Sequence, residues 1–190
     1  IYDQYSKGKD WGRQIDSMWN IYSCYNSEKL KRDMRIDIKT IKASRLITEL
    51  EQAFRVWKEN VYTRNCSFET FCDYILPYRQ ENGLLVDSAR QMFYSRHRGQ
   101  FFTNSGKNMI EEADSLLRFY SYIGHSGFHA TGIPIWDVAT LEKLRHGLCI
   151  HKCWHNTLLF SSLGMAVATD VVPAWANRGS SHSWNAFHEW

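Results

Sequence analysis

Two cysteines and two histidines alternate over residues 149–155, within the stretch RHGLCIHKCWHN at residues 145–156. Cys149, His151, Cys153 and His155 are all possible metal ligands, and a cysteine with a histidine can also form a nucleophile–base pair. In a helix each residue turns by about 100°, so the two cysteines share one face and the two histidines point nearly the opposite way. In a strand the four would share a face but span about 20 Å. The segment alone therefore predicts no four-ligand zinc site, although a two-ligand half site completed elsewhere stays open.

The position of Cys149 favours a reactive thiol. It follows His-Gly-Leu and is expected to open a helix that runs to Leu163, with Gly164 at its end. A thiol at a helix start lies at the positive end of the helix dipole, beside free N–H groups, and both favour the thiolate. Cys153 lies one turn deeper, where this effect has faded and burial is expected. We therefore predict that Cys149 is a nucleophile and that Cys153 is a packing residue.

A histidine that could serve as the base follows in SSHSWN, residues 180–185. A cysteine nucleophile needs a base within hydrogen-bond reach, usually histidine, which a third group orients. His182 is expected at the start of a strand. A helix, a return strand, a loop and this second strand can bring His182 back to the helix start at Cys149.

The elements that must position these residues predict an α+β fold. Helical spacing of apolar residues, capping residues and breakers indicate helices over 38–59, 68–76, 84–94, 109–122, 138–146 and 149–163. β-Branched residues with a following proline indicate a strand over 165–172, and the last nine residues also read as a strand. We place a boundary near residue 105, between a helical support region, 1–105, and a mixed core, 106–190.

Three motifs together resemble the transglutaminase-like superfamily: GLC at 147–149, SSLGMAV at 161–167 and HSW at 182–184. In addition, FETFCDYILPYR at 68–79 and DVVPAWANRGSSHSWN at 170–185 are similar to segments of large Bacteroidetes proteins with transglutaminase-like domains. The resemblance implies a papain-like core, in which a helix that starts with cysteine packs on an antiparallel sheet that carries histidine.

The resemblance also implies the chemistry, which is acyl transfer through a thioester on a peptide or protein amide, without a cofactor. Cys149 would be the nucleophile and His182 the general base. Water as acceptor would make the protein a protease or amidase, and an amine would make it a transglutaminase. Both outcomes stay open. The same resemblance implies a periplasmic or extracellular bacterial protein.

The third catalytic residue of the family does not have an evident counterpart. It is an Asp or Asn on the strand after the histidine strand, and the sequence ends soon after His182. Either the chain is a fragment or another residue takes this role, for example Asp170. The alternative for Asp170 is a strand-end cap or a contact with Arg178. A further departure is GMAV at 164–167, where GIPA is usual.

Substrate contacts are expected from the loop before the base and from the base's own strand. Trp175, Asn177 and Arg178 lie in this loop, and Trp184 follows His182 in the strand. A plain connecting loop is the alternative. Trp136 is a second tryptophan that could place an indole N–H near an oxyanion, as Trp184 could, although both could equally be core residues.

Composition limits the partners. The 190 residues carry a net charge of +3 with scattered basic residues, which argues against nucleic acid as a partner. We expect no membrane span, because no apolar run approaches the ~20 residues that one requires. Five cysteines without a disulfide-like spacing predict at least one free thiol.

Three functional hypotheses follow. The first is the cysteine acyl-transfer enzyme, and the second is a catalytically inactive transglutaminase-like module that binds peptide or glycan. The third is a metalloprotein that uses Cys149, Cys153 and some of the histidines. His151 and His155 face away from Cys149 in a regular helix, so we expect them at a surface or an interface.

Overall fold

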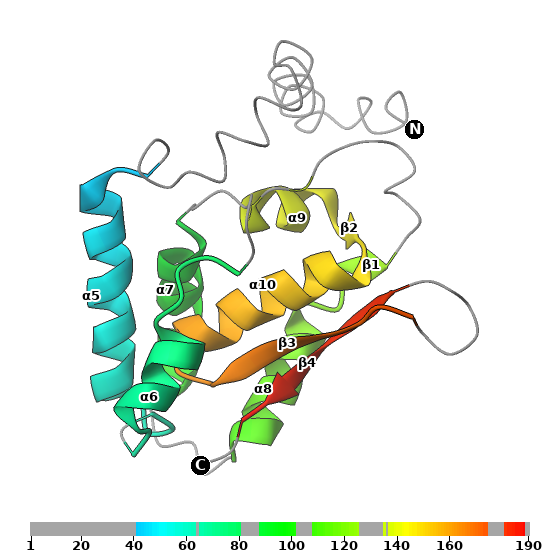
Figure 1. The fold of residues 1–190 in the computed structure, drawn as a ribbon. Helices are drawn as coiled ribbons and strands as arrows, with labels where there is room; N and C mark the ends of the chain where they lie inside the picture. Colours follow the sequence, from blue (N-terminus) through cyan, green and yellow to red (C-terminus); the bar gives the residue numbers. More distant parts are fainter. Residues whose placement is uncertain are drawn as a thin grey trace.

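The computed structural model describes residues 41–63, 65–80, 88–101, 108–125, 135, 137–174 and 181–188. Helices pack around one central helix, and a small antiparallel hairpin covers one side of it (Figure 1). This arrangement confirms the predicted α+β class. Among the described helices, none is both long enough and apolar enough to cross a bilayer.

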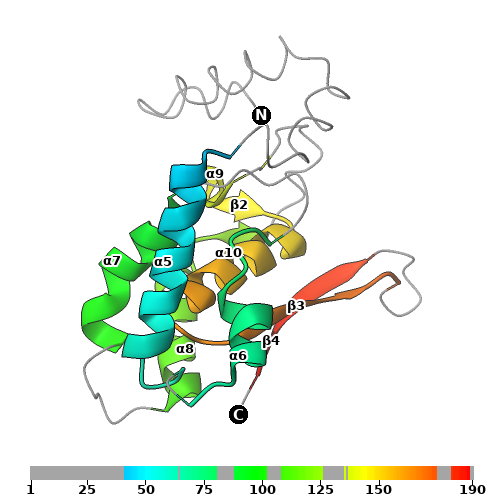
Figure 2. The ribbon, with the colours of Figure 1, turned by 60° about the vertical axis from the view of Figure 1, so that its left-hand side comes forward.

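The central helix is α10 (Cys149–Ser162), the helix that the sequence predicts from Cys149 onward. It contacts helices α5 (Ala43–Glu59), α7 (Ala89–Phe101) and α9 (Val138–Leu144), and it also contacts strands β3 (Val167–Val172) and β4 (His182–Phe187). Figure 2 shows α5 and α7 on one side of α10 and the β3–β4 hairpin on the other. Because α10 is covered from both sides, its second half is buried all round, from Thr157 to Ser162.

Both ends of α10 are defined by specific residues. At its start, the backbone N–H of Leu148 donates to Nδ1 of His151 at 3.1 Å, where no Ser or Asp cap is available. At its end, Gly164 has φ of +81°, and a Cβ there would lie 2.9 Å from Nδ2 of Asn60. Only glycine satisfies both the left-handed conformation and this close approach. The helix stop predicted at Gly164 is confirmed.

Strands β3 and β4 form an antiparallel pair in which Val172 lies opposite His182 and Asp170 opposite Trp184. Successive side chains of a strand point to opposite faces of the sheet. Asn185 bonds to α10 (see below), so Ser183 and Phe187 share the face toward α10 and His182 and Trp184 lie on the other face. Both strands were predicted, and this register fixes which side chains share a face.

The remaining helices begin largely as their capping residues predict. Ser67 Oγ accepts from the N–H of Thr70 at 3.1 Å, and opens α6 (Phe68–Thr70), which a π-helical turn, η1 (Phe71–Ile75), continues. Asp137 Oδ1 accepts from the N–H of Thr140 at 2.6 Å and caps α9. Asn108 forms a capping box at α8 (Met109–Phe119). Helix α7 extends past the predicted end at residue 94.

The predicted helix over 138–146 is too long, because α9 closes at Arg145, which is in the left-handed region with φ of 57°. Gly147 instead belongs to β2 (His146–Gly147), which pairs in parallel with β1 (Gly124–His125). A Cβ on Gly147 would lie 2.8 Å from Cδ1 of Leu141. The glycine therefore allows β2 to pack closely on α9, just before α10 begins.

Two groups of buried apolar side chains hold these elements together. The larger lies among α7, α8, α9 and α10 and includes Phe93, Leu116, Leu141 and Phe160. The smaller joins α5, η1 and the start of the hairpin, through residues such as Ala53, Phe71, Ile75 and Ala166. Helices from before residue 105 thus pack directly against the elements that follow it. The division into 1–105 and 106–190 stays a prediction.

Candidate active site

A groove of about 410 Å³ runs along α10 on the side of β4. Cys149, Lys152, Cys153 and Asn156 line it from α10, and most of β4, beginning with His182, lines it from the opposite side. Leu117 of α8 and the ring of Phe160 lie at its apolar part. The structure therefore brings the predicted nucleophile and the predicted base, which are distant in sequence, to the same groove.

Cys149 is the first residue of α10, and its side chain is partly exposed. The first N–H groups of a helix, including that of residue 149 here, have no acceptor within the helix. They are therefore available to a negatively charged atom bound beside the thiol, and the helix dipole favours such a charge.

Cys153 has the opposite environment, one turn further along α10. Its side chain is buried, as the sequence predicts. Burial, and then repulsion from Cys149, raise the pKa of the Cys153 thiol to about 11. A thiol with this pKa is almost entirely protonated at neutral pH, so Cys153 is a poor nucleophile.

His182 and Trp184 lie side by side on one face of β4, with ring centroids 6.3 Å apart. Both line the groove, although Ser183 and Asn185 of the opposite face line it as well. β4 pairs only with β3 among the described strands. Its second edge is thus unpaired within the described residues, and side chains of both faces line the groove.

Asp170 lies on the exposed part of β3, directly opposite Trp184. Cross-strand partners share a face, so Asp170 is on the same face as His182 and one diagonal away from it. Diagonal neighbours of this kind are roughly 7–8 Å apart, within reach of longer side chains. The role of Asp170 in orienting His182 stays a prediction. The predicted contacts Trp175, Asn177 and Arg178, and also Trp136, lie outside the described residues.

Asn185 is a site residue that the sequence analysis missed. Its Nδ2 lies within hydrogen-bond distance of the Cys153 carbonyl oxygen at 3.2 Å and of Thr157 Oγ1 at 2.9 Å, both on α10. It also reaches the carbonyl oxygen of Ala168 on β3 at 3.4 Å. Its Oδ1 accepts from Nδ2 of Asn156 at 3.1 Å. One amide thus ties the strand of His182 to the helix of Cys149. The signal that could have revealed it is its place in the strand, because Asn185 shares a face with Ser183 and Phe187 and this face points toward α10.

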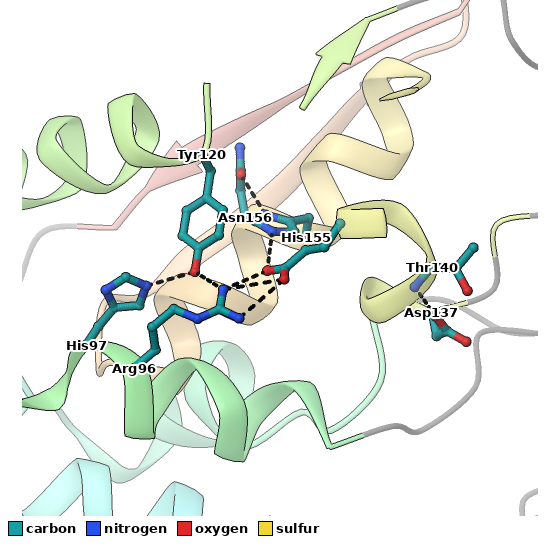
Figure 3. Close-up of polar contacts among 8 residues, drawn as sticks. Arg96, His97, Tyr120, Asp137, Thr140, His155 and Asn156 are labelled. Carbon is teal, nitrogen blue, oxygen red and sulfur yellow. Dashed lines mark hydrogen bonds and ion pairs between the residues drawn. The ribbon is translucent and has the colours of Figure 1, made fainter. Parts of the chain in front are cut away.

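A partly buried polar network lies on the other side of α10 and centres on Glu142 (Figure 3). Arg96 Nη1 donates to Glu142 Oε1 at 3.1 Å and to Tyr120 Oη at 2.8 Å. His155 Nε2 lies 3.5 Å from Glu142 Oε1. Tyr120 Oη is also 2.8 Å from Nε2 of His97. Three helices, α7, α9 and α10, therefore meet through charged and polar side chains as well as through the core.

His155 corrects one prediction, because it is 1% exposed and not at a surface. Its ring packs edge-on against Phe93 and Tyr120, at centroid distances of 5.2 and 4.8 Å. The face of α10 away from Cys149 is covered by α7 and α9, so this face offers a histidine a partly buried carboxylate as partner. His155 Nδ1 lies 3.3 Å from Oδ1 of Asn156, whose amide reaches Asn185. The network is thereby continuous with the groove.

The network predicts acid sensitivity. Burial favours a raised pKa for Glu142, but the hydrogen bonds from His155 and Arg96 outweigh it and leave the pKa lowered. A lowered carboxyl pKa stabilises the fold above the unfolded value of about 4.3, and this contribution is lost as pH falls through the folded pKa. We expect the free energy of unfolding to fall less between pH 5 and pH 3 in Glu142→Gln than in the wild type, measured by urea denaturation. An equal fall in both proteins would contradict this.

No three His, Cys, Asp or Glu side chains gather closely enough to hold a metal ion in the part of the chain that the structure describes. Comparison of the chain with known proteins gives no further guide. No family model matches it, and neither a curated protein nor a solved structure does.

Proposed function

We propose that this protein is a cysteine-dependent acyl-transfer enzyme that acts on amides of a peptide or protein, with a papain-like, transglutaminase-like core. One observation carries the proposal: Cys149, at the start of a buried helix, and His182, at the start of the strand packed beside it, line one groove. Nucleophile and base at the ends of two such elements are the arrangement that thiol catalysis needs.

The reaction uses these groups in order. Cys149 Sγ attacks the amide carbonyl carbon, and the first N–H groups of α10 stabilise the negative charge that forms on the carbonyl oxygen. His182, protonated when it takes the thiol proton, donates this proton to the leaving nitrogen as the C–N bond breaks. Water or an amine then attacks the thioester and releases Cys149. Asp170 orients the imidazole, and Trp184 contacts the substrate.

The rate of alkylation tests the pair. We expect iodoacetamide to label Cys149 faster at neutral pH than it labels 2-mercaptoethanol, because the helix start favours the thiolate and His182 can take the thiol proton. His182→Ala should slow this labelling. The rate is followed by mass spectrometry of the peptide that contains residue 149.

His188→Ala is the matched control, since His188 follows β4 directly but stacks on Tyr74, at a centroid distance of 5.1 Å, and does not line the groove. This variant should leave the labelling rate unchanged. A wild-type rate at Cys149 no higher than that of 2-mercaptoethanol would refute the enzyme and favour the catalytically inactive binding module. Protection that a chelator reverses would favour a metal site instead.

A further inference from the structure

The charge of the groove is one-sided. Lys152 is a permanent cation in its wall, and His182 becomes a second cation when protonated. Every other residue that lines the groove, within the part of the chain that the structure describes, is neutral or a thiol, and none is Asp or Glu. A substrate group that enters this groove therefore meets positive charge without a compensating carboxylate in the wall.

Lys152 is close to the reacting atom. It follows Cys149 by three positions on α10, and side chains at this spacing are neighbours on a helix surface, with about 5–6 Å between their Cβ atoms. Its charge also reaches the next thiol. Burial and Cys149 raise the pKa of Cys153, and the ammonium group of Lys152 opposes them.

Lys152 also lacks the partners that other cations of this protein have. Arg90 pairs with Glu49 and Arg96 pairs with Glu142, both within 3.1 Å. Lys152 forms no ion pair with any residue that the structure describes. Its charge is therefore available to a bound molecule, whereas a lysine held in a structural ion pair would not be.

We propose that the groove selects anionic substrates, in which a carboxylate close to the scissile amide pairs with Lys152. This inference rests on the proposed function of Cys149 and names its substrate class: acidic peptides, with Asp, Glu or a terminal carboxylate beside the bond that is cleaved or transferred. A lysine at this distance attracts such a carboxylate during approach and fixes it during reaction.

Two small alkylating agents measure this preference directly. The two reagents differ in one group only, since iodoacetate carries a carboxylate where iodoacetamide carries a neutral amide. In both, the thiolate forms an S–C bond as the C–I bond breaks and iodide leaves. We expect the rate constant of iodoacetate divided by that of iodoacetamide to be larger at Cys149 than for 2-mercaptoethanol, a neutral thiol. Lys152→Gln should lower the ratio at Cys149 by about three- to tenfold, which corresponds to the Coulomb energy of one solvent-screened charge pair about 4 Å apart in water.

Three comparisons make the result specific to Lys152. Lys152→Arg should keep the ratio, because it keeps the charge. Lys143→Gln, on the exposed side of α9, makes the same chemical change away from the groove and should have no effect. Raising the salt concentration should narrow the wild-type ratio, because added ions screen the attraction.

The outcomes separate this inference from the proposed function. A ratio that Lys152→Gln leaves unchanged overturns the anionic substrate class, even where Cys149 is labelled rapidly at neutral pH as the enzyme requires. If Cys149 instead behaves as an ordinary thiol, the enzyme proposal fails. The ratio measured at pH 9, where any such thiol reacts, still reports whether Lys152 attracts a carboxylate to the groove.

Discussion

Cys149→Ala is expected to abolish the rapid release of p-nitrophenol from p-nitrophenyl acetate, a general acyl donor. The wild type should release one burst as the Cys149 thiolate attacks the ester and becomes acetylated, and then a slower phase as water hydrolyses the thioester. Without the thiol the burst rate should fall by at least about 10²-fold. Stopped-flow absorbance gives the rate, and mass spectrometry of the quenched protein locates the acetyl group.

Cys153→Ala is the matched control, because it removes a thiol from the same helix and the same groove. Cys153 is buried with a raised pKa, so this variant should keep the burst. Circular dichroism confirms that both variants fold. A burst that survives in Cys149→Ala but disappears in Cys153→Ala would assign the nucleophile to Cys153 and contradict the proposal.

The second large effect is expected in stability, at Glu49. Arg90 is buried, and its guanidinium donates to Glu49 Oε2 at 3.1 Å, to the Ile75 carbonyl oxygen at 3.0 Å and to the Pro77 carbonyl oxygen at 2.7 Å. Burial lowers the pKa of Arg90, and Glu49 counteracts this. Glu49→Leu leaves the buried cation without its carboxylate, which should cost about 3–5 kcal/mol in urea denaturation.

Asp114→Asn supplies the comparison, since its partner Arg118 is largely exposed and their ion pair contributes little. The double variant Glu49→Leu/Arg90→Met should be more stable than Glu49→Leu alone, because it removes the unpaired charge along with its partner. A loss at Glu49 no larger than that at Asp114 would show that water or a rearranged side chain reaches Arg90 in the variant.

Local sequence signals predict much of this fold. Asp137 and Ser67 cap the helices predicted to begin at residues 138 and 68, and Gly164 ends α10. These signals work because capping and left-handed glycine depend on a few adjacent residues. β1 and β2 escaped prediction because strands of two residues have no periodic pattern. The early end of α9 at Arg145 escaped because a left-handed arginine gives no sequence signal.

The candidate site shows the same division between local and long-range information. The sequence indicates Cys149 and His182 individually, and the structure places them on one groove, which no local pattern encodes. The burial of His155 was not predictable from helical periodicity. Periodicity tells which side chains share a face, but not whether another helix covers that face. Here α7 supplies Arg96, which helps to hold the carboxylate beside His155.

The hydrogen bonds of Asn185 have a consequence for how β4 could move. Sliding β4 along β3 by two residues would keep the same side chains on the same faces, so the alternation of apolar and polar residues alone permits it. Such a slip would move His182 by about 6.8 Å along the strand and change its position in the groove. It would also separate the Asn185 amide from its acceptors on α10 and leave a half-buried polar group without these hydrogen bonds. Asn185 therefore fixes the hairpin in a single strand register.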